Sequence, residues 1–438
     1  MANTHGESAS EYEPLALTGG IPALDGLNVV EGGGVTSALG FRASGIHAGF
    51  RANPERLDLA LVVADEPCAC AATFTKNVFC AAPVIVSRHN LDDVSYGTAR
   101  GLIVNSGTAN AATGSKGIEA AEYVCAMTGE TLGCPASEVM VASTGVIGVH
   151  LNLDVFDSQV PNAFAALSRD GGADAARAIM TTDTHPKEFA VSFDGGDIGY
   201  DGATFTVGGM CKGSGMIMPD MATMIACITT DAPMVPDVLH TALVGAVATS
   251  FNKVTVDSDT STNDSCYLFA SGAAAPGAAP IEPGTAAYDR FTSALRAVCE
   301  TLARAMASDG EGATRLITVR VAGAADDADA DVAARTIANS PLVKTAIFGH
   351  DANWGRIAGA VGRSGARFEQ HDVSIDIMGI PVLRAGLPVP FDEDEALRRF
   401  ERPEIDLDVD LGAGSSSTAI WTCDFSHDYV TINGDYRT

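Results

Sequence analysis

One segment of the sequence leads from a glycine-rich loop into an apolar run that begins with a threonine. It starts at Lys212, continues as Gly-Ser-Gly-Met-Ile-Met-Pro-Asp-Met, and reaches Ala222 and Thr223 before the run Met-Ile-Ala-Cys-Ile. A loop that ends in a buried strand can hold a hydroxyl rigidly at the strand tip, where nucleophiles are often presented. Thr223 is therefore a candidate nucleophile, and Ala222 before it offers a carbonyl that is open to attack.

A threonine hydroxyl is a poor nucleophile unless a base takes its proton, and this segment contains no histidine. If the Thr223 hydroxyl attacks the carbonyl of Ala222 and forms an ester, the bond between the two residues breaks and an α-amine is freed. That amine titrates near pH ~8 and belongs to the same residue as the hydroxyl, so one residue supplies both nucleophile and base. The segment alone leaves a simpler alternative open, in which Thr223 begins a strand and its hydroxyl caps a turn.

A second segment offers groups that stabilise a negatively charged oxygen. The run Val-Ala-Ser-Thr-Gly-Val-Ile-Gly ends a predicted strand with Thr144 and Gly145, which supply a hydroxyl and an unhindered backbone N–H. Acyl transfer needs such donors aimed at the developing oxyanion, and the loss of one typically costs about 3 kcal/mol of transition-state stabilisation. An ordinary glycine turn after a strand is the alternative.

Apolar runs typical of strands alternate along the chain with alanine-rich stretches typical of helices, which predicts a mixed α/β fold. Strands are predicted at residues 57–63, 83–87, 102–105, 139–142, 189–193, 204–207, 224–229, 254–256, 316–321, 373–377, 405–409, 419–423 and 429–432. Helices are predicted at residues 117–132, 173–180, 236–250 and 286–306. The strands near the C-terminus are expected to be antiparallel, and residues 272–280 are predicted to form a flexible linker.

The composition limits the class of protein. The chain has 438 residues and a formal net charge of −28, which argues against nucleic acid and membranes as partners. Ten cysteines without a charged and then apolar leader favour reduced thiols and a cytoplasmic location. Cys68 and Cys70 have no second Cys or His pair at zinc-site spacing, so no metal is expected. Residues 1–15 are predicted to be a flexible acidic tail.

Taken together, the ordered segments resemble the ornithine acetyltransferases of arginine biosynthesis, also called bifunctional glutamate N-acetyltransferase / amino-acid acetyltransferases. The resemblance spans nearly the whole chain after the predicted tail. The segments that carry it are Val104-Asn-Ser-Gly-Thr-Ala-Asn-Ala, the Ser-Thr-Gly run that ends at Gly145, Met180-Thr-Thr-Asp-Thr, Lys212 to Met224, Phe251-Asn to Ser265, Gly349-His-Asp-Ala-Asn-Trp-Gly-Arg and Asn433-Gly-Asp-Tyr-Arg-Thr438.

The resemblance implies one cleavage, before Thr223, and a heterotetramer of two α and two β chains. The α chain would be residues 1–222, of which 16–222 follow the tail, and the β chain would be residues 223–438. By the same resemblance, Thr223 is the nucleophile, and Thr144 and Gly145 form the oxyanion hole. The amino-acid site that it implies consists of Thr181, Lys212, Thr223, Glu311, Asn433 and Thr438.

These implied roles make physical sense for an amino-acid substrate. Lys212 can pair with an α-carboxylate, and Glu311 can hold the cationic δ-amine of ornithine. Without the resemblance, Lys212 would be interpreted as a solvated loop cation and Glu311 as a polar turn residue.

The implied reaction is a two-step transfer without a cofactor. Thr223 takes the acetyl group from N-acetylornithine, ornithine leaves, and glutamate accepts the group to give N-acetylglutamate. Some members of the family also use acetyl-CoA as donor, and no motif decides whether this chain does.

The fold implied by the resemblance is a layered sandwich of β-sheets covered by helices, similar to self-cleaving aminopeptidases. A self-processed hydrolase or aminopeptidase that uses the same Thr223 is therefore the alternative function. An unprocessed scaffold or binding protein is a third.

Overall fold

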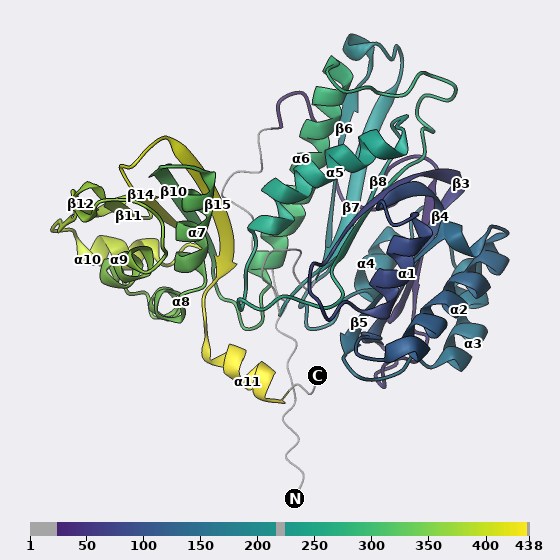
Figure 1. Cartoon of the computed structure of the whole chain (residues 1–438), viewed down its shortest axis with the longest axis horizontal. Coiled ribbons are helices and arrows are strands. Elements are labelled where there is room, and N and C mark those ends of the chain that lie inside the picture. Colours follow the sequence, from purple (N-terminus) through teal and green to yellow (C-terminus); the bar gives the residue numbers. More distant parts are fainter. Residues whose placement is uncertain (1–23, 216–223, 436–438) are drawn as a thin grey trace, which may run out of the picture.

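The computed structural model describes residues 24–215 and 224–435, and within them two β-sheets are covered by helices (Figure 1). The first sheet contains β1 (Asn28–Val29), β2 (Phe41–Ile46), β3 (Leu59–Phe74), β4 (Tyr96–Thr108), β5 (Val139–Val146), β6 (Lys187–Asp194), β7 (Thr204–Lys212), β8 (Ile225–Thr230) and β9 (Ser265–Ala270). The second contains β10 (Leu316–Ala324), β11 (Ser374–Ile377), β12 (Ile380–Arg384), β13 (Leu387–Pro388), β14 (Glu404–Asp410) and β15 (Ser416–Cys423). The α-helices are α1 (Ala82–Asn90), α2 (Gly114–Leu132), α3 (Leu153–Ala165), α4 (Gly172–Ala178), α5 (Pro236–Thr249), α6 (Ala286–Ser308), α7 (Asp327–Ala338), α8 (Pro341–Phe348), α9 (Trp354–Gly362), α10 (Glu393–Arg399) and α11 (His427–Asp435).

The long strand β3 joins two halves of the first sheet. The strand order is β1-β6-β7-β8-β9-β3-β4-β5, and β2 also pairs with β3. The first part of β3 pairs with β2 and its last part with β9, and its register against β4 shifts between Val63 and Cys68. Such an irregularity bends a strand and increases its twist. One half therefore contains β6 to β9, and the other contains β2 to β5.

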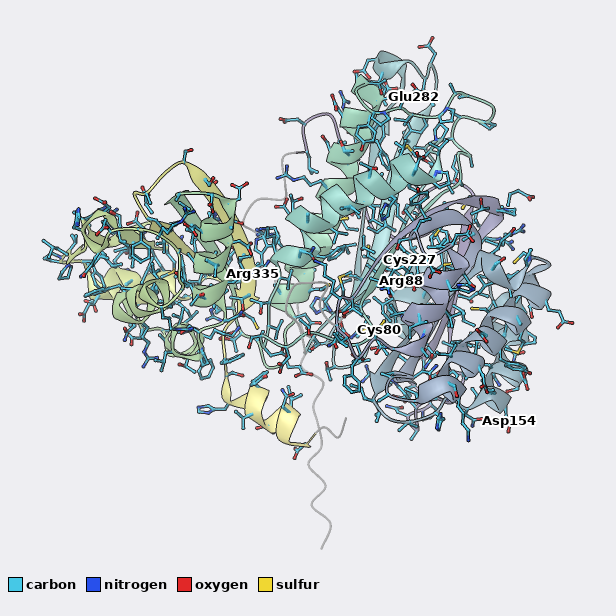
Figure 2. The ribbon with its side chains drawn as sticks, in the orientation of Figure 1. Cys80, Arg88, Asp154, Cys227, Glu282 and Arg335 are labelled. Carbon is cyan, nitrogen blue, oxygen red and sulfur yellow. The ribbon has the colours of Figure 1, made fainter. Side chains whose placement is uncertain are left out.

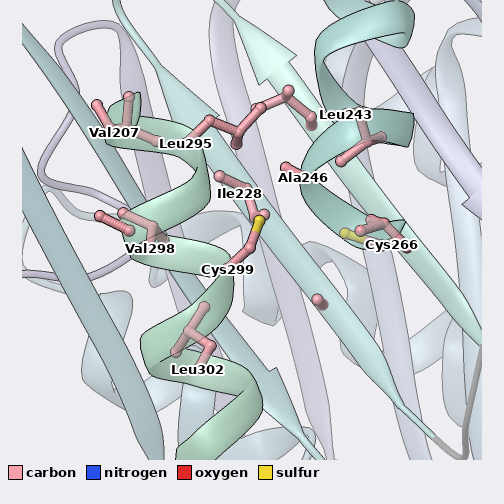
Figure 3. Packing of buried hydrophobic residues seen from close by; sticks show 14 of the residues in the cluster. Val207, Ile228, Leu243, Ala246, Cys266, Leu295, Val298, Cys299 and Leu302 are labelled. Atoms are coloured by element: carbon pink, nitrogen blue, oxygen red, sulfur yellow. The ribbon is translucent and has the colours of Figure 1, made fainter. Parts of the chain in front are cut away.

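Side chains on β8 show that the two halves face each other. Successive residues of a strand point to opposite faces. Ile225 and Cys227 belong to a buried cluster that also contains Val62 of β3 and Met140 of β5. Ile228 points the other way, into a cluster with α5 and α6 (Figure 3). The core of the larger body therefore lies between two β-layers, and a second core lies under α5 and α6.

The outer face of the larger body that lies opposite α5 and α6 is covered by the helices α2 and α3. Leu61 of β3 and Val141 of β5 pack there against Val124 of α2 and Phe156 of α3. The larger body is consequently built as helices, sheet, sheet and helices. This arrangement confirms the predicted α/β class, a layered sandwich of β-sheets covered by helices.

The second sheet forms a smaller lobe beside this sandwich, together with α7 to α10 (Figure 1). Its strand order is β13-β12-β11-β14-β10-β15, and β14 runs parallel to β10 and antiparallel to β11. The predicted antiparallel arrangement is correct for β11 and β14, whereas β15 pairs with β10, which lies between β14 and β15 and runs parallel to β14. Alternation along β14 buries Ile405 and Leu407 under the helices and leaves Asp406 and Asp408 on the other face.

Polar side chains occupy the periphery of the molecule. Asp154 of α3 and Glu282 are exposed, whereas Cys227 lies inside the larger body (Figure 2). Among the described residues, none of the helices has the length and apolar character that a membrane span requires.

The strand predicted at residues 83–87 is wrong, because this run belongs to helix α1. A short apolar run does not distinguish strand from buried helix by periodicity alone. Pro83 is in the first turn of the helix, where its missing N–H costs nothing, and the basic side chains of Arg88 and His89 lie in the last turn. Packing against β5 then decides in favour of the helix, since the Ser87 hydroxyl donates to Val141 O at 2.8 Å.

Two further predicted strands are also wrong. Residues 429–432 lie in helix α11, whose Val430 is 71% exposed, so no sheet receives this β-branched run. Residues 254–256 form only an isolated bridge, between Val254 and Trp421. Residues 272–280, the predicted linker, connect β9 with the segment before α6 inside the larger body.

Candidate functional site

The ends of several strands and loops meet at one pocket with a volume of about 90 Å³. Its walls contain six of the residues that the sequence predicts for the site, which are Thr144, Gly145, Thr181, Lys212, Glu311 and Asn433. The other residues of the wall are Ala109, Ile147, Thr182, Gly215, Ser261, Thr262 and Asn263. Segments far apart in the sequence thus contribute to one small cavity, and most of the residues in its wall are polar.

The candidate oxyanion residues lie at the end of β5, beside the end of β4. Thr144 and Gly145 are paired in register with Ser106 and Gly107. Gly145 has φ +128°, and a Cβ at this position would lie 2.3 Å from the Gly107 carbonyl carbon. Only glycine therefore fits here, which leaves the backbone of this strand end open toward the pocket.

Asn263 holds this strand end in place. Its amide nitrogen donates to Ser143 O at 2.8 Å and to Ala109 O at 2.6 Å. The Ser143 hydroxyl in turn donates to Asn105 Oδ1 at 2.6 Å. Since the Ser143 carbonyl belongs to the peptide bond that contains the Thr144 N–H, this network sets the direction of that N–H.

Lys212 ends β7 and is only 1% exposed, which excludes the interpretation as a solvated loop cation. Burial lowers the pKa of its ammonium group, while the carboxylates of Asp183, Asp264 and Glu311 act in the opposite direction. An ammonium group in this position can pair with an anionic group of a ligand in the pocket.

Glu311 lies in the loop after α6 and is 7% exposed, so it is not a simple surface turn residue. Its Oε2 accepts a hydrogen bond of 2.8 Å from the side-chain amide of Asn433 on α11. Gly215 makes room for the carboxylate, because a Cβ at that position would lie 2.3 Å from Oε2. The far C-terminal helix is thereby attached to the pocket through Glu311.

Thr181 belongs to the loop that follows α4 and is held through its backbone. Its N–H donates to Asp183 Oδ2 at 3.0 Å, and its carbonyl accepts from Arg56 Nη2 at 3.0 Å. The neighbouring carbonyl of Met180 accepts from Arg51 Nη2 at 2.9 Å. These contacts place Thr181 at the wall of the pocket.

Three of the predicted residues, Ala222, Thr223 and Thr438, lie outside the described residues. Met224 is described, and its N–H donates to Asp264 Oδ1 at 2.9 Å. The Asp264 side chain is buried, and its Oδ2 has no hydrogen bond from a described residue. Burial raises the pKa of Asp264 well above its ordinary value. Asp264 thus anchors the beginning of β8, which directly follows the candidate nucleophile in the sequence.

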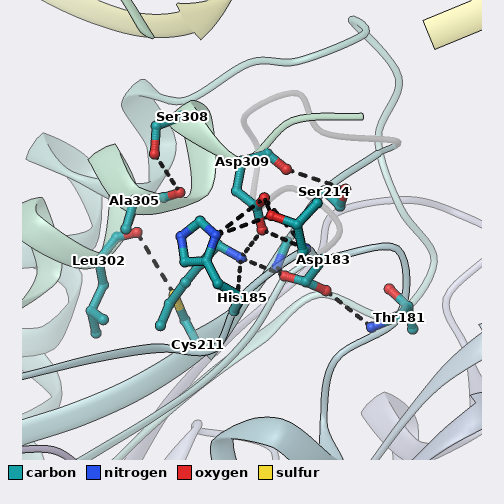
Figure 4. Close-up of polar contacts among 12 residues, drawn as sticks. Thr181, Asp183, His185, Cys211, Ser214, Leu302, Ala305, Ser308 and Asp309 are labelled. Carbon is teal, nitrogen blue, oxygen red and sulfur yellow. Dashed lines mark hydrogen bonds and ion pairs between the residues drawn. The ribbon is translucent and has the colours of Figure 1, made fainter. Parts of the chain in front are cut away.

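A buried ionic network adjoins the pocket, and the sequence analysis did not identify it (Figure 4). Lys187 of β6 contacts both Asp183 and Asp309. The charge pattern of Met180-Thr-Thr-Asp-Thr and of Ser-Asp-Gly-Glu offered a signal, since each run places an acidic residue two positions from a predicted site residue. Asn263 offered a similar signal, because it lies in the segment from Phe251 to Ser265.

The sequence is similar to those of known proteins. The model of the ArgJ family matches residues 42–438. The arginine biosynthesis bifunctional protein ArgJ of Symbiobacterium thermophilum is 47% identical over 407 residues, which cover 93% of this chain and 99% of that protein. The protein of the same name from Thermosynechococcus vestitus is 46% identical over 93% of this chain and 98% of its own length.

Two solved structures are also similar. An ArgJ structure from Bacillus halodurans has 42% sequence identity and a TM-score of 0.46, over 48% of this chain and 97% of its own. An ornithine acetyltransferase of Mycobacterium tuberculosis, solved with ornithine, has 37% sequence identity and a TM-score of 0.39. The match covers 44% of this chain and 98% of that chain. The family model and the curated relatives show that the protein is an α/β enzyme of arginine biosynthesis. More particularly, the chain belongs to the ArgJ family.

Proposed function

We propose that this chain is an ornithine acetyltransferase that moves acetyl from N-acetylornithine to glutamate through an ester on Thr223. The observation that carries the proposal is the pocket, which joins the candidate oxyanion residues with a buried cation and a buried carboxylate. Lys212 suits the α-carboxylate of an amino acid, and Glu311 suits the δ-ammonium of ornithine. The names of the curated ArgJ relatives, which refer to arginine biosynthesis, support the same pathway.

In the first half of the cycle, the Thr223 hydroxyl attacks the acetyl carbonyl of N-acetylornithine, and the α-amine of Thr223 takes the hydroxyl proton. Thr144 and Gly145 donate to the oxyanion, and the proton passes to the nitrogen of ornithine as the amide bond breaks. In the second half, the amine of glutamate attacks the ester, and the proton returns to the Thr223 oxygen. Thr181, Asn433 and Thr438 complete the amino-acid site, and the cycle uses no cofactor.

The same proposal includes the maturation and assembly of the enzyme. The chain cuts itself between Ala222 and Thr223 into an α chain that ends at residue 222 and a β chain of residues 223–438. Two copies of each form a heterotetramer in the cytoplasm. Cleavage is required for transfer because the α-amine that serves as base does not exist in the uncut chain.

Intact-mass measurement of Thr223→Ala tests both steps. The wild-type protein is expected to give two chains that divide between Ala222 and Thr223, and incubation with N-acetylornithine should add one acetyl group to the β chain. Thr223→Ala should give one uncut chain without the adduct, because it has no hydroxyl. Thr223→Ser is the matched control and should still be cut and acetylated.

The products of the wild-type reaction separate this function from a hydrolase. N-acetylglutamate should form when glutamate is present. Release of acetate at the same rate with and without glutamate would instead assign the chain to the hydrolases. An active, uncut Thr223→Ala protein would contradict the proposed nucleophile.

A further inference from the structure

The side chain of Lys187 is completely buried between two carboxylates. Its Nζ lies 2.7 Å from Asp183 Oδ1 and 2.5 Å from Asp309 Oδ2. Burial alone would lower the pKa of this ammonium, but the two carboxylates outweigh burial and raise it. Although burial opposes ionisation of Asp309, its hydrogen bond with His185 and the charge of Lys187 lower its pKa to about 2. Burial likewise opposes ionisation of Asp183, but the charges of Lys187 and Lys212 lower its pKa. The three groups are therefore charged at neutral pH.

Each carboxylate also holds backbone that leads into the pocket. Asp183 accepts from the N–H of Thr181 at 3.0 Å and from the N–H of Gly213 at 2.8 Å. Through these two bonds it connects the loop of Thr181 with the residue that follows Lys212.

Asp309 performs the same task for the third segment of the pocket. It accepts from the N–H of Thr184 at 3.0 Å, and its own carbonyl accepts from the Ser214 hydroxyl at 3.3 Å. The N–H of Glu311, two residues later, donates to Ser214 O at 3.3 Å. Through Asp183 and Asp309, which Figure 4 labels, Lys187 connects three segments, and each segment carries one predicted substrate residue.

Stability alone does not explain such a group. Removing an ammonium and two carboxylates from water costs several kcal/mol for each ion, and a buried ion pair is often no more stabilising than apolar residues of similar volume. One cation also faces two anions here, so the local charge is not balanced by Lys187 alone. What the arrangement does provide is a fixed spacing between the three segments.

We propose that Lys187 is a positioning residue that sets the distances between the substrate groups of Thr181, Lys212 and Glu311. It acts through Asp183 and Asp309 and does not line the pocket itself. The inference rests on the proposed function. If the chain is cut before Thr223, Lys187 and Asp183 belong to the α chain and Asp309 to the β chain. The contact then aligns the two fragments at the substrate site.

Steady-state kinetics of Lys187→Met tests the inference. Methionine keeps the length of the side chain but leaves the two carboxylates without their shared cation. The Michaelis constants for N-acetylornithine and for glutamate are expected to rise at least about tenfold, while kcat changes less than about threefold. The Michaelis constants should change more than kcat because the groups that bind substrate, on Thr181, Lys212 and Glu311, move apart. The Thr223 hydroxyl and the oxyanion groups of Thr144 and Gly145 keep their positions. The assay is run well below the Tm of the variant.

Arg304→Met is the matched control. Arg304 forms another buried ion pair, with Glu404 at 2.8 Å, and it does not line the pocket. This variant should lower the Tm and leave both Michaelis constants within about twofold. An equal rise in Arg304→Met and Lys187→Met would overturn the inference, because it would show general loosening of the fold.

A second variant covers the case in which Lys187→Met does not fold. Asp183→Asn leaves Lys187 paired with Asp309, but its single amide oxygen cannot replace both carboxylate oxygens. The same rise in Michaelis constants is expected, and unchanged constants in either folded variant would overturn the inference. If the wild-type protein transfers no acetyl group, the proposed function fails, and the Kd of ornithine measured by calorimetry in these variants still tests Lys187.

Discussion

The residues of this site are unusual for how deeply their charges are buried. Lys187, Lys212 and Asp264 are each nearly inaccessible to solvent, although the molecule carries a large excess of negative charge. Lys187 donates to Asp183, which also accepts from the Gly213 N–H, and Asp264 accepts from the Met224 N–H. These buried carboxyl groups therefore fix the residue next to Lys212 and the beginning of β8. Burial has a further effect elsewhere in the first sheet, where it raises the pKa of the Glu188 carboxyl group into the physiological range.

Glu188 of β6 provides the clearest pH prediction at this scale. Burial raises its pKa from 4.5 to about 7 in the folded protein. The stability associated with the protonated form is fully present below about pH 4.5 and is lost as the pH rises through about 7. Glu188→Gln should therefore raise the Tm by about 1–3 °C at about pH 8 and leave it unchanged at about pH 5.

Thermal unfolding at the two pH values checks this expectation, with Glu282→Gln as the exposed control that should change neither Tm. Equal shifts at both pH values would show that the charge of Glu188 is not the cause.

At the scale of elements, the long helices were the most predictable part. Residues 286–306 were predicted as helix and α6 covers 286–308, because an apolar stripe extends over many turns and Thr285 caps the first turn by accepting from the Tyr288 N–H. Short apolar runs were less predictable: 139–142 and 405–409 are strands as expected, whereas 83–87 and 429–432 are helical, because packing on other elements decides their conformation.

The site was predictable to the extent that its residues belong to recognisable segments. Thr144, Lys212 and Glu311 were predicted, and all three line the pocket. The residues that position these three side chains were not predicted. Lys187 and Asp309 are 122 positions apart in the sequence, and only folding brings the two side chains together. Local patterns mark Asp183 and Asp309 as acidic neighbours of predicted site residues, but they do not show that Lys187 joins the two.

Strand β5 allows a test of how an element presents catalytic groups. Asn263→Ala removes the two hydrogen bonds that the side-chain amide donates to the carbonyls of Ser143 and Ala109 at the pocket end of β5. We expect kcat to fall at least about tenfold with a Michaelis constant within about threefold, because oxyanion groups act in the transition state. Steady-state kinetics measures both constants.

Asn90→Ala is the control for this test. Asn90 donates to Val139 O at 2.9 Å and therefore supports the other end of the same strand. It should reduce stability without reducing kcat. A similar loss of kcat in Asn263→Ala and Asn90→Ala would mean that β5 stabilises the fold but does not orient the oxyanion groups.

At the scale of the whole molecule, the predicted cleavage point does not coincide with the boundary between the larger body and the lobe. The proposed β chain contributes β8 and β9 to the first sheet, where they lie between β7 and β3 of the proposed α chain. The two fragments consequently share backbone ladders on both sides as well as the buried clusters around Ile225 and Ile228.

We therefore expect the cut fragments to stay together under native conditions. Size-exclusion chromatography with light scattering should show one species of about the heterotetramer mass, containing both fragments in equal amounts. The association should persist in about 1 M salt, because strand pairing and apolar burial depend little on screening. Separation of the fragments in native buffer would contradict this prediction.

Helix α11 leaves the lobe and brings Asn433 to Glu311, so a residue of the last described helix lines the pocket. A bulky label attached at Val430, which is 71% exposed on the same helix, would therefore lie close to the pocket wall. Kinetic constants measured on protein labelled at this position would describe an enzyme with an altered substrate site.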